Sequence, residues 1–338
     1  MKNGNPFKNL ALIITIILVV LGVYTYKEFV DYQNDNNRLS YSETKIQSVK
    51  TEKTAVLEET PRTNNSELGS VITEKSPEIS FLWDYTQKWG YNCLSKEEKE
   101  VYAKLFNAAK EEKTSVNVTS SFVKGESVDK IAQAVVNDNP QFLNFFKKIQ
   151  YTYNSTDANR YMRLIEINYR KSTGGAELEA VAADIISQAE SQADDYSKVK
   201  FIHDTIIENC SYLEHVYDEN SFVYTAAGPL VYNKGVCEGY AKAFSYLVQS
   251  MGIPCFCVSG TAVNSIGQID HHMWNVVQIN GDWYNVDVTW DDPVTYTGEN
   301  VLRHDYFLIG DKFYSNHTPN TTIPLPLTVN DFNSTLYN

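Results

Sequence analysis

The pattern of this chain begins with one uninterrupted uncharged run near the N-terminus, and from Phe81 onward the apolar positions form a series of periodic patterns. The run covers residues 9–26, close to the lower limit of about 17–25 residues for a helix that crosses a membrane. Lysines at positions 2 and 8 precede it, so the positive-inside bias predicts that residues 1–8 are cytoplasmic and that the remainder is extracytoplasmic, at the cell surface. A cleaved signal peptide is the competing interpretation, although no small-residue cleavage site follows the run.

Residues 27–79 are dominated by polar side chains, and residues 42–80 contain no aromatic residue. Such a segment cannot bury enough apolar surface to offset the entropy that ordering costs. We therefore expect a flexible stalk that holds the folded part away from a bilayer.

Periodic patterns within residues 80–190 predict an N-terminal packing domain of α/β type, whose role the sequence does not indicate. Ser95 and Glu98 form a capping box before apolar residues at helical spacing. A second helix is expected over residues 127–137, short strands near residues 151–153 and 162–166, and two helical stretches within residues 177–209.

A cysteine stands at the start of the next predicted helix. Cys237 precedes an apolar stripe that continues through Phe244 to Met251, and Gly252 and Pro254 then end the helix. The unpaired N–H groups and the dipole of a first helical turn favour a thiolate, and they could stabilise an oxyanion formed when that sulfur attacks a carbonyl. A cysteine in this place is weak evidence by itself, because many such residues are buried and inert.

A predicted hairpin strengthens the case for chemistry at Cys237. Two β-rich runs flank Asn280-Gly281, and a two-residue loop there places Trp274 opposite Asp287, with His272 as the diagonal neighbour of Asp287. A carboxylate in that position can hold the imidazole tautomer while the other ring nitrogen meets a thiol. His271 should point to the opposite face, although a register slip of one residue would exchange the two histidines.

Charge and cysteine content narrow the classes of function. The net charge of −13, with no basic stripe, argues against nucleic acid as a partner. Five cysteines, at positions 93, 210, 237, 255 and 257, leave at least one free thiol in an exported protein. A metal site of Asp270, His271 and His272 is a rival interpretation. Successive strand residues diverge, however, and no second ligand cluster has metal spacing, so we expect no metal and no other cofactor.

Three motifs in order, GVCEGYAKAF, HMWNVV and NGDWYNVDVTWDDP, resemble the transglutaminase-like superfamily of papain-related cysteine enzymes. The later HDYFLIGDKFYSNHT resembles bacterial members of that superfamily. The resemblance implies an α+β catalytic domain over residues 191–338, in which the Cys237 helix packs on an antiparallel sheet. It also implies that Cys237 is the nucleophile, His272 the general base and acid, and Asp287 the orienting carboxylate.

The resemblance implies attack on an amide carbonyl, of protein glutamine above all, and a thioester intermediate. An amine would resolve the thioester in a transglutaminase, and water would do so in a protease or amidase. The acidic charge suits a cationic lysine acceptor. Cell-wall peptides and host proteins are candidate substrates, and Trp274 and Trp290 are candidates for lining the cleft. His203, His304 and His317 are expected to be structural. A surface adhesion or assembly protein with a vestigial triad is the alternative from another class.

Overall fold

The computed structural model describes residues 40–46, 83–143, 145–154, 157–170, 175, 177–214, 216, 218, 221–294 and 301–333. By its internal contacts the chain divides into residues 1–40 and residues 41–338, and the second unit holds nearly all of the described residues. The apolar run at residues 9–26 lies outside the described residues, so the predicted anchor and its topology stay predictions. Within the described residues, no helix has both the length and the apolar character to cross a membrane.

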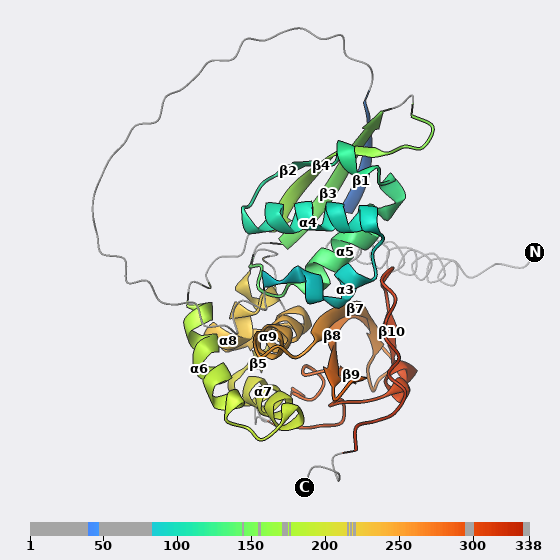
Figure 1. Cartoon of the computed structure of the whole chain (residues 1–338). Helices are drawn as coiled ribbons and strands as arrows, with labels where there is room; N and C mark the ends of the chain where they lie inside the picture. The colour runs from blue at the N-terminus through green and yellow to red at the C-terminus, as the bar shows by residue number, and fades with distance from the viewer. Residues whose placement is uncertain are drawn as a thin grey trace, which may run out of the picture. The chain divides into compact units, whose positions relative to one another are not determined.

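The N-terminal half of the second unit is built on a four-stranded sheet with two helices against it (Figure 1). The strand order is β1-β3-β4-β2, and β4 pairs antiparallel with both β2 and β3. The elements are β1 (Ser40–Ile46), β2 (Ser115–Asn117), β3 (Phe145–Asn154), β4 (Met162–Arg170), α4 (Lys96–Lys110) and α5 (Val128–Asp138). The predicted capping box at Ser95 and Glu98, the second helix and both strands are confirmed.

Strand β1 falls inside the segment predicted to be a flexible stalk. Residues 40–46 take the edge position beside β3, whereas the rest of residues 27–79 lies outside the described residues. An edge strand is held by backbone hydrogen bonds along one side, which require no apolar composition. An argument from composition alone therefore cannot detect it.

In its described residues, the C-terminal half combines four helices with a second antiparallel sheet of order β10-β7-β8-β9. Its helices are α6 (Leu178–Glu190), α7 (Asp195–Asn209), α8 (Ala227–Val231) and α9 (Cys237–Ser250). Its strands are β7 (Cys255–Val263), β8 (Ile269–Ile279), β9 (Asp282–Val286) and β10 (His317–Pro319), with β5 (Ser211–Tyr212) and β6 (Lys234–Gly235) as a separate parallel pair. This is the α+β arrangement that the sequence predicts.

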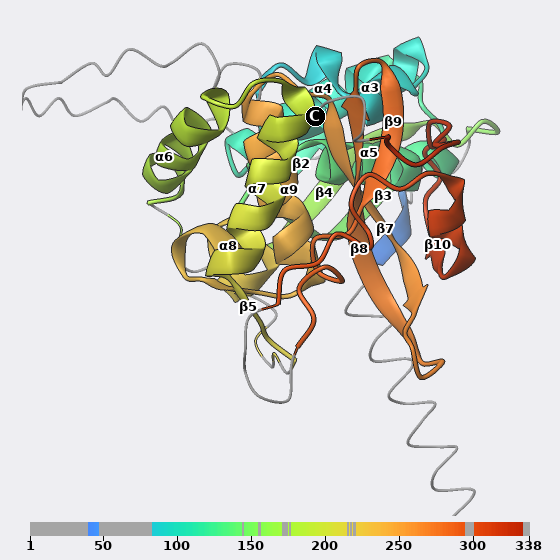
Figure 2. The ribbon, with the colours of Figure 1, turned by 90° about the horizontal axis from the view of Figure 1, so that it is seen from below.

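Helix α9 is buried along almost its whole length because it lies between helices α6–α8 and the second sheet. Figure 2 shows α7 and α9 side by side. The core between helices and sheet contains Val277 and Ile279 of β8, while Trp274 and Val276 of the same strand pack on the opposite face, under the C-terminal segment. Helix α6 contributes Leu178 to the first core, although the predicted boundary at 190 assigns it to the N-terminal domain.

A short helix, α3 (Trp89–Asn92), packs against both halves. The N–H groups of Gly90 and Tyr91 each donate to the buried Asp138 carboxylate over 2.9 Å. The Trp89 ring stacks 6.1 Å from that of Phe256 on β7. Among the residues that the structure describes, the remaining short elements are five 3₁₀ turns, η1 (Tyr85–Gln87), η2 (Thr119–Ser121), η3 (Gly125–Ser127), η4 (Phe222–Tyr224) and η5 (Asp311–Ser315).

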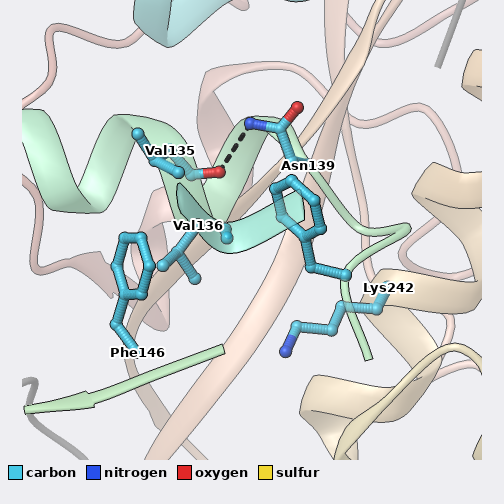
Figure 3. A pocket seen from close by; sticks show the side chains of 7 residues that line it. Val135, Val136, Asn139, Phe146 and Lys242 are labelled. Atoms are coloured by element: carbon cyan, nitrogen blue, oxygen red, sulfur yellow. Dashed lines mark hydrogen bonds between the residues drawn. The ribbon is translucent and has the colours of Figure 1, made fainter. Parts of the chain in front are cut away.

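A small hollow between α5, β3 and α9 is mainly apolar (Figure 3). At the rim of this hollow, the side-chain amide of Asn139 donates to the carbonyl of Val135 over 2.6 Å. The ammonium of Lys242 is bound by Glu238 at 2.7 Å and by the carbonyl of Tyr224 at 3.2 Å. The lining residues are Ala109, Val135, Val136, Asn139, Phe142, Phe146 and Lys242. The predicted triad is not among them, so we do not assign this hollow to the site.

Candidate active site

Cys237 is the first residue of α9, as the sequence predicts, and it is partly exposed. Val236 precedes it in extended conformation and supplies no side-chain cap to the helix. Two residues on, Gly239 allows a close approach of the chain: a Cβ there would lie 2.2 Å from the carbonyl oxygen of Val223. The helix ends before Gly252, whose φ of 75° is left-handed. The thiol thus stands at an uncapped helix start.

The predicted hairpin has the predicted register. Asn280 and Gly281 both have positive φ, 54° and 92°, as a type I′ turn requires. Ile279 pairs with Asp282 across this turn. The pairing continues as far as Asn275 of β8, opposite Val286, where β9 ends. Asp287 therefore follows directly after the last paired residue of β9.

The three predicted triad residues meet. His272 Nε2 lies 2.6 Å from Asp287 Oδ2, and both side chains are buried. Asp287 engages Nε2, which leaves Nδ1 as the ring nitrogen that can meet the Cys237 thiol, and the nearby thiol helps to raise the pKa of this imidazole. His271 is exposed, so the predicted distinction between the two adjacent histidines is confirmed.

The Asp287 carboxylate has further donors on both oxygens. Its Oδ1 accepts from the backbone N–H groups of Thr289, at 3.1 Å, and Trp290, at 3.2 Å. Its Oδ2 accepts from His317 Nε2 at 3.1 Å as well as from His272. Burial alone would raise the pKa of Asp287, but the imidazole of His272 and the hydrogen bonds hold it well below its usual value.

His317, which was expected to be structural, thus belongs to the site. It lies on β10, opposite Ala262 of β7, and its ring stacks 4.0 Å from that of Phe313. The sequence shows only an isolated histidine before Thr-Pro. Nothing local indicates that this segment pairs with β7, so the only available signal was its inclusion in the motif that resembles bacterial family members.

The protonation of His272 is set by opposing effects. Burial would lower the pKa of this imidazole, but the adjacent Asp287 carboxylate raises it to about 10, with a further contribution from Cys237. The site therefore favours an imidazolium at neutral pH. Burial raises the pKa of the thiols of Cys93, Cys210, Cys255 and Cys257, which disfavours a thiolate at those positions.

Tyr212 also lies near the thiol. It sits on β5, where it pairs with Gly235, two residues before Cys237. Burial raises the pKa of its phenol, and the nearby Cys237, Asp270 and Asp287 act in the same direction. Tyr212 is partly buried and packs against the core between the helices and the second sheet.

The two tryptophans that are candidates for lining the cleft, Trp274 and Trp290, differ in their exposure to solvent. Trp274 is completely buried against Phe313 and His317, so the expectation that it lines a substrate cleft is corrected. The C-terminal segment covers the face of β8 that Trp274 occupies. Trp290 is partly exposed, and its ring lies 5.4 Å from that of His272, so it remains a candidate for contact with substrate.

Two groups of described side chains are close enough to share a metal ion: His272, Asp287 and His317, and a separate group of His203, Asp204 and His304. In both groups the same atoms already form hydrogen bonds with one another. The rival set in the sequence, Asp270 with His271 and His272, is not gathered in this way.

Comparison with known proteins agrees with this geometry. Residues 179–288 match the model of the transglutaminase-like superfamily. Kyphoscoliosis peptidase of Homo sapiens is 25% identical over 202 residues, which cover 54% of this chain and 30% of that protein. The matched segment therefore spans less than a third of the human protein.

Similar solved structures include a TGase, with a TM-score of 0.30 and 14% identity over 56% of this chain and 64% of that one. The periplasmic domain of TgpA from Pseudomonas aeruginosa gives a TM-score of 0.27 and 15% identity, over 38% of this chain and 54% of that one. At such TM-scores these likenesses add no argument of their own. The segment that matches the family model carries Cys237, His272 and Asp287, so residues 179–288 are similar to transglutaminase-like cysteine enzymes at all three positions of the candidate triad.

Proposed function

We propose that this enzyme transfers acyl groups from amide substrates, glutamine side chains of proteins or peptides above all, through a thioester on Cys237. The observation that carries the proposal is the 2.6 Å bond between His272 Nε2 and Asp287 Oδ2, which leaves Nδ1 of the same ring to the thiol. Asp287 is the orienting carboxylate, and His272 exchanges the proton.

The chemistry balances in two steps. The Cys237 thiolate attacks the amide carbonyl carbon, and the C–N bond breaks while the His272 imidazolium donates its proton to the departing ammonia. A primary amine then attacks the thioester, His272 takes up its proton, and the thiolate leaves as the new amide forms. The N–H groups of the first turn of α9 are suited to stabilise the oxyanion of both tetrahedral intermediates.

The choice of acceptor decides between two activities. Asp270, an exposed carboxylate two residues before His272, suits a cationic amine, as does the net charge of −13. Water as acceptor would give a protease or amidase with the same triad. The human relative that is called a peptidase favours this second candidate.

We further propose that the enzyme acts outside the cytoplasm as a single-pass membrane protein. The support is the uncharged run at residues 9–26 with lysines before it, followed by the polar stalk. Cell-wall peptides or host proteins would then be within reach of the site.

The test follows incorporation of a biotinylated alkylamine into dimethylated casein by the full chain. Ammonia release and new N-termini are measured in the same reactions. Amine incorporation that Cys237→Ala abolishes supports the transferase. New N-termini without incorporated amine would show that the enzyme is a peptidase and not a transferase. Equal signals from wild type and Cys237→Ala in all three assays would refute cysteine catalysis on this substrate class. The exposed neighbour His271→Gln serves as the matched control and should retain activity.

A further inference from the structure

A second cluster of charged side chains lies outside the triad. His203, fully buried on α7, places Nδ1 2.9 Å from Asp204 Oδ1 and Nε2 3.1 Å from Asp291 Oδ2. His304 Nε2 lies 2.7 Å from the same oxygen of Asp204, and Lys200 pairs with the other oxygen. No step of the proposed reaction uses these groups directly.

The distances favour a hydrogen-bond network over a metal site. Ligand atoms about 2.0–2.1 Å from a tetrahedral zinc lie ~3.3 Å apart. The atoms of His203 and His304 approach Asp204 more closely than that, at 2.9 and 2.7 Å. The Lys200 ammonium on the same carboxylate would also repel a cation.

The network reaches the triad through a single turn of chain. Asp291 N–H donates to the carbonyl of Asp287 over 3.2 Å, and Asp287 N–H donates to the carbonyl of Tyr306 over 3.0 Å. Tyr306 N–H in turn donates to Asp291 Oδ1 over 3.0 Å. The backbone of Asp287 is therefore tied to Asp291 both directly and through Tyr306.

His203 supplies the charge that this buried turn needs. When both carboxylates are ionised they can only accept, so both ring nitrogens of His203 donate and the ring bridges Asp204 and Asp291 as an imidazolium. Burial would lower its pKa, but the hydrogen bonds to the two carboxylates raise it. Burial raises the pKa of Asp291, His203 opposes that rise, and the nearby Asp287 charge adds to it. If His203 were removed, the buried carboxylates of Asp287 and Asp291 would lie on one turn and Asp291 would lose its cationic partner.

We propose that His203 is a positioning residue for the reaction: through Asp291 it fixes the turn at residues 287–291, which presents the Asp287 carboxylate to His272. The inference rests on the proposed function of the triad. A histidine on α7, remote from Cys237 in the chain, thus sets the geometry of the catalytic carboxylate.

The experiment measures iodoacetamide labelling of Cys237 against pH in the full chain, by mass spectrometry of each cysteine. In His203→Gln and in Asp291→Asn, the midpoint of labelling should move upward by about one pH unit, a tenfold change in the thiolate equilibrium. The reason is that displacement of Asp287 would lower the pKa of His272 and so reduce the population of the imidazolium that stabilises the thiolate. In the amine-incorporation assay, kcat should fall by roughly 10- to 100-fold, as misplacement predicts, with KM within twofold.

His304→Gln is the matched control, because it removes a histidine that contacts Asp204 and not Asp291. Its labelling midpoint should stay within about 0.3 pH unit of that of the wild type. A shift of that size is about a twofold change in the equilibrium, since one pH unit is tenfold. Thermal unfolding identifies any variant that fails to fold, and the double variant of His203 and Asp291 should add little to either single change.

Three results would overturn the proposal or its basis. Unmoved midpoints in both folded variants would show that His203 does not position Asp287. An equal shift in His304→Gln would show that the Asp291 contact is not the route. An unreactive Cys237 in the wild type would instead remove the proposed function itself.

Discussion

Replacing Asp287 by asparagine should abolish most activity while hardly changing the shape of the site. The carboxylate accepts from four donors: the N–H groups of Thr289 and Trp290 on Oδ1, and the imidazoles of His272 and His317 on Oδ2. An amide has a single oxygen, so its NH₂ group must face one of these pairs. Backbone N–H groups cannot become acceptors, and we therefore expect the amide nitrogen to face the two imidazoles.

An amide N–H beside His272 Nε2 requires that nitrogen to accept. The ring proton then moves to Nδ1, the nitrogen that faces Cys237, where it prevents the neutral imidazole from taking the thiol proton. In a Ser–His–Asp triad the same loss of tautomer costs about 10⁴ in kcat. The charge is lost as well: a pKa of about 10 for His272, against the ordinary 6.5, corresponds to at most about 5 kcal/mol of preference for imidazolium.

The assay combines kcat for amine incorporation with the pH profile of Cys237 labelling. Loss of the His272 imidazolium beside the thiol should slow labelling of Cys237 at pH 7. His271→Gln, on the exposed face of the same strand, should leave both measurements unchanged. An Asp287→Asn enzyme that keeps more than a tenth of kcat, with an unmoved labelling profile, would show that the Asp287 carboxylate does not set the tautomer and charge of His272.

Three further outcomes are expected. Because the pKa of His272 is raised to about 10, its stabilising contribution is complete below pH 6.5 and is lost as the pH rises toward 10; urea unfolding of wild type and His272→Gln should therefore differ more at pH 6 than at pH 9.5. Gly239→Ala forces a Cβ against the Val223 carbonyl and should destabilise the fold by about 1–3 kcal/mol, and an unchanged melting temperature would contradict this. Ser95→Ala removes the cap of α4 and should cost about 1 kcal/mol in chemical unfolding, with Cys237 labelling unaffected.

The triad could be predicted because each of its members follows from a local rule. Asn280-Gly281 determines the hairpin register, the register places His272 beside Asp287, and the apolar stripe with its terminal glycine defines the helix that begins at Cys237. These rules act over short stretches of chain, where one sequence is sufficient.

The remaining features of the site depend on contacts between distant segments. Trp274 shares a strand face with His272, as its spacing predicts, but the C-terminal segment with Phe313 buries that face. No local pattern reveals which face is covered. The sequence predicts a structural His203, in the core or at the surface, and the structure buries it. Its partner Asp291 is far along the chain and appears in the sequence only as part of a turn. Pairings of this kind are determined by tertiary packing.

The position of His317 on β10 has a consequence for how the enzyme is made. Synthesis proceeds from the N-terminus, at about 5–20 residues per second, so Cys237, His272 and Asp287 all leave the ribosome before His317 does. Until β10 joins β7, the Asp287 carboxylate lacks one of its four donors, and Trp274 lacks the rings of Phe313 and His317 that cover it. Completion of the site thus waits for β10, so the fully formed nucleophile appears only after the segment that follows Asp287 has been made and has paired with β7.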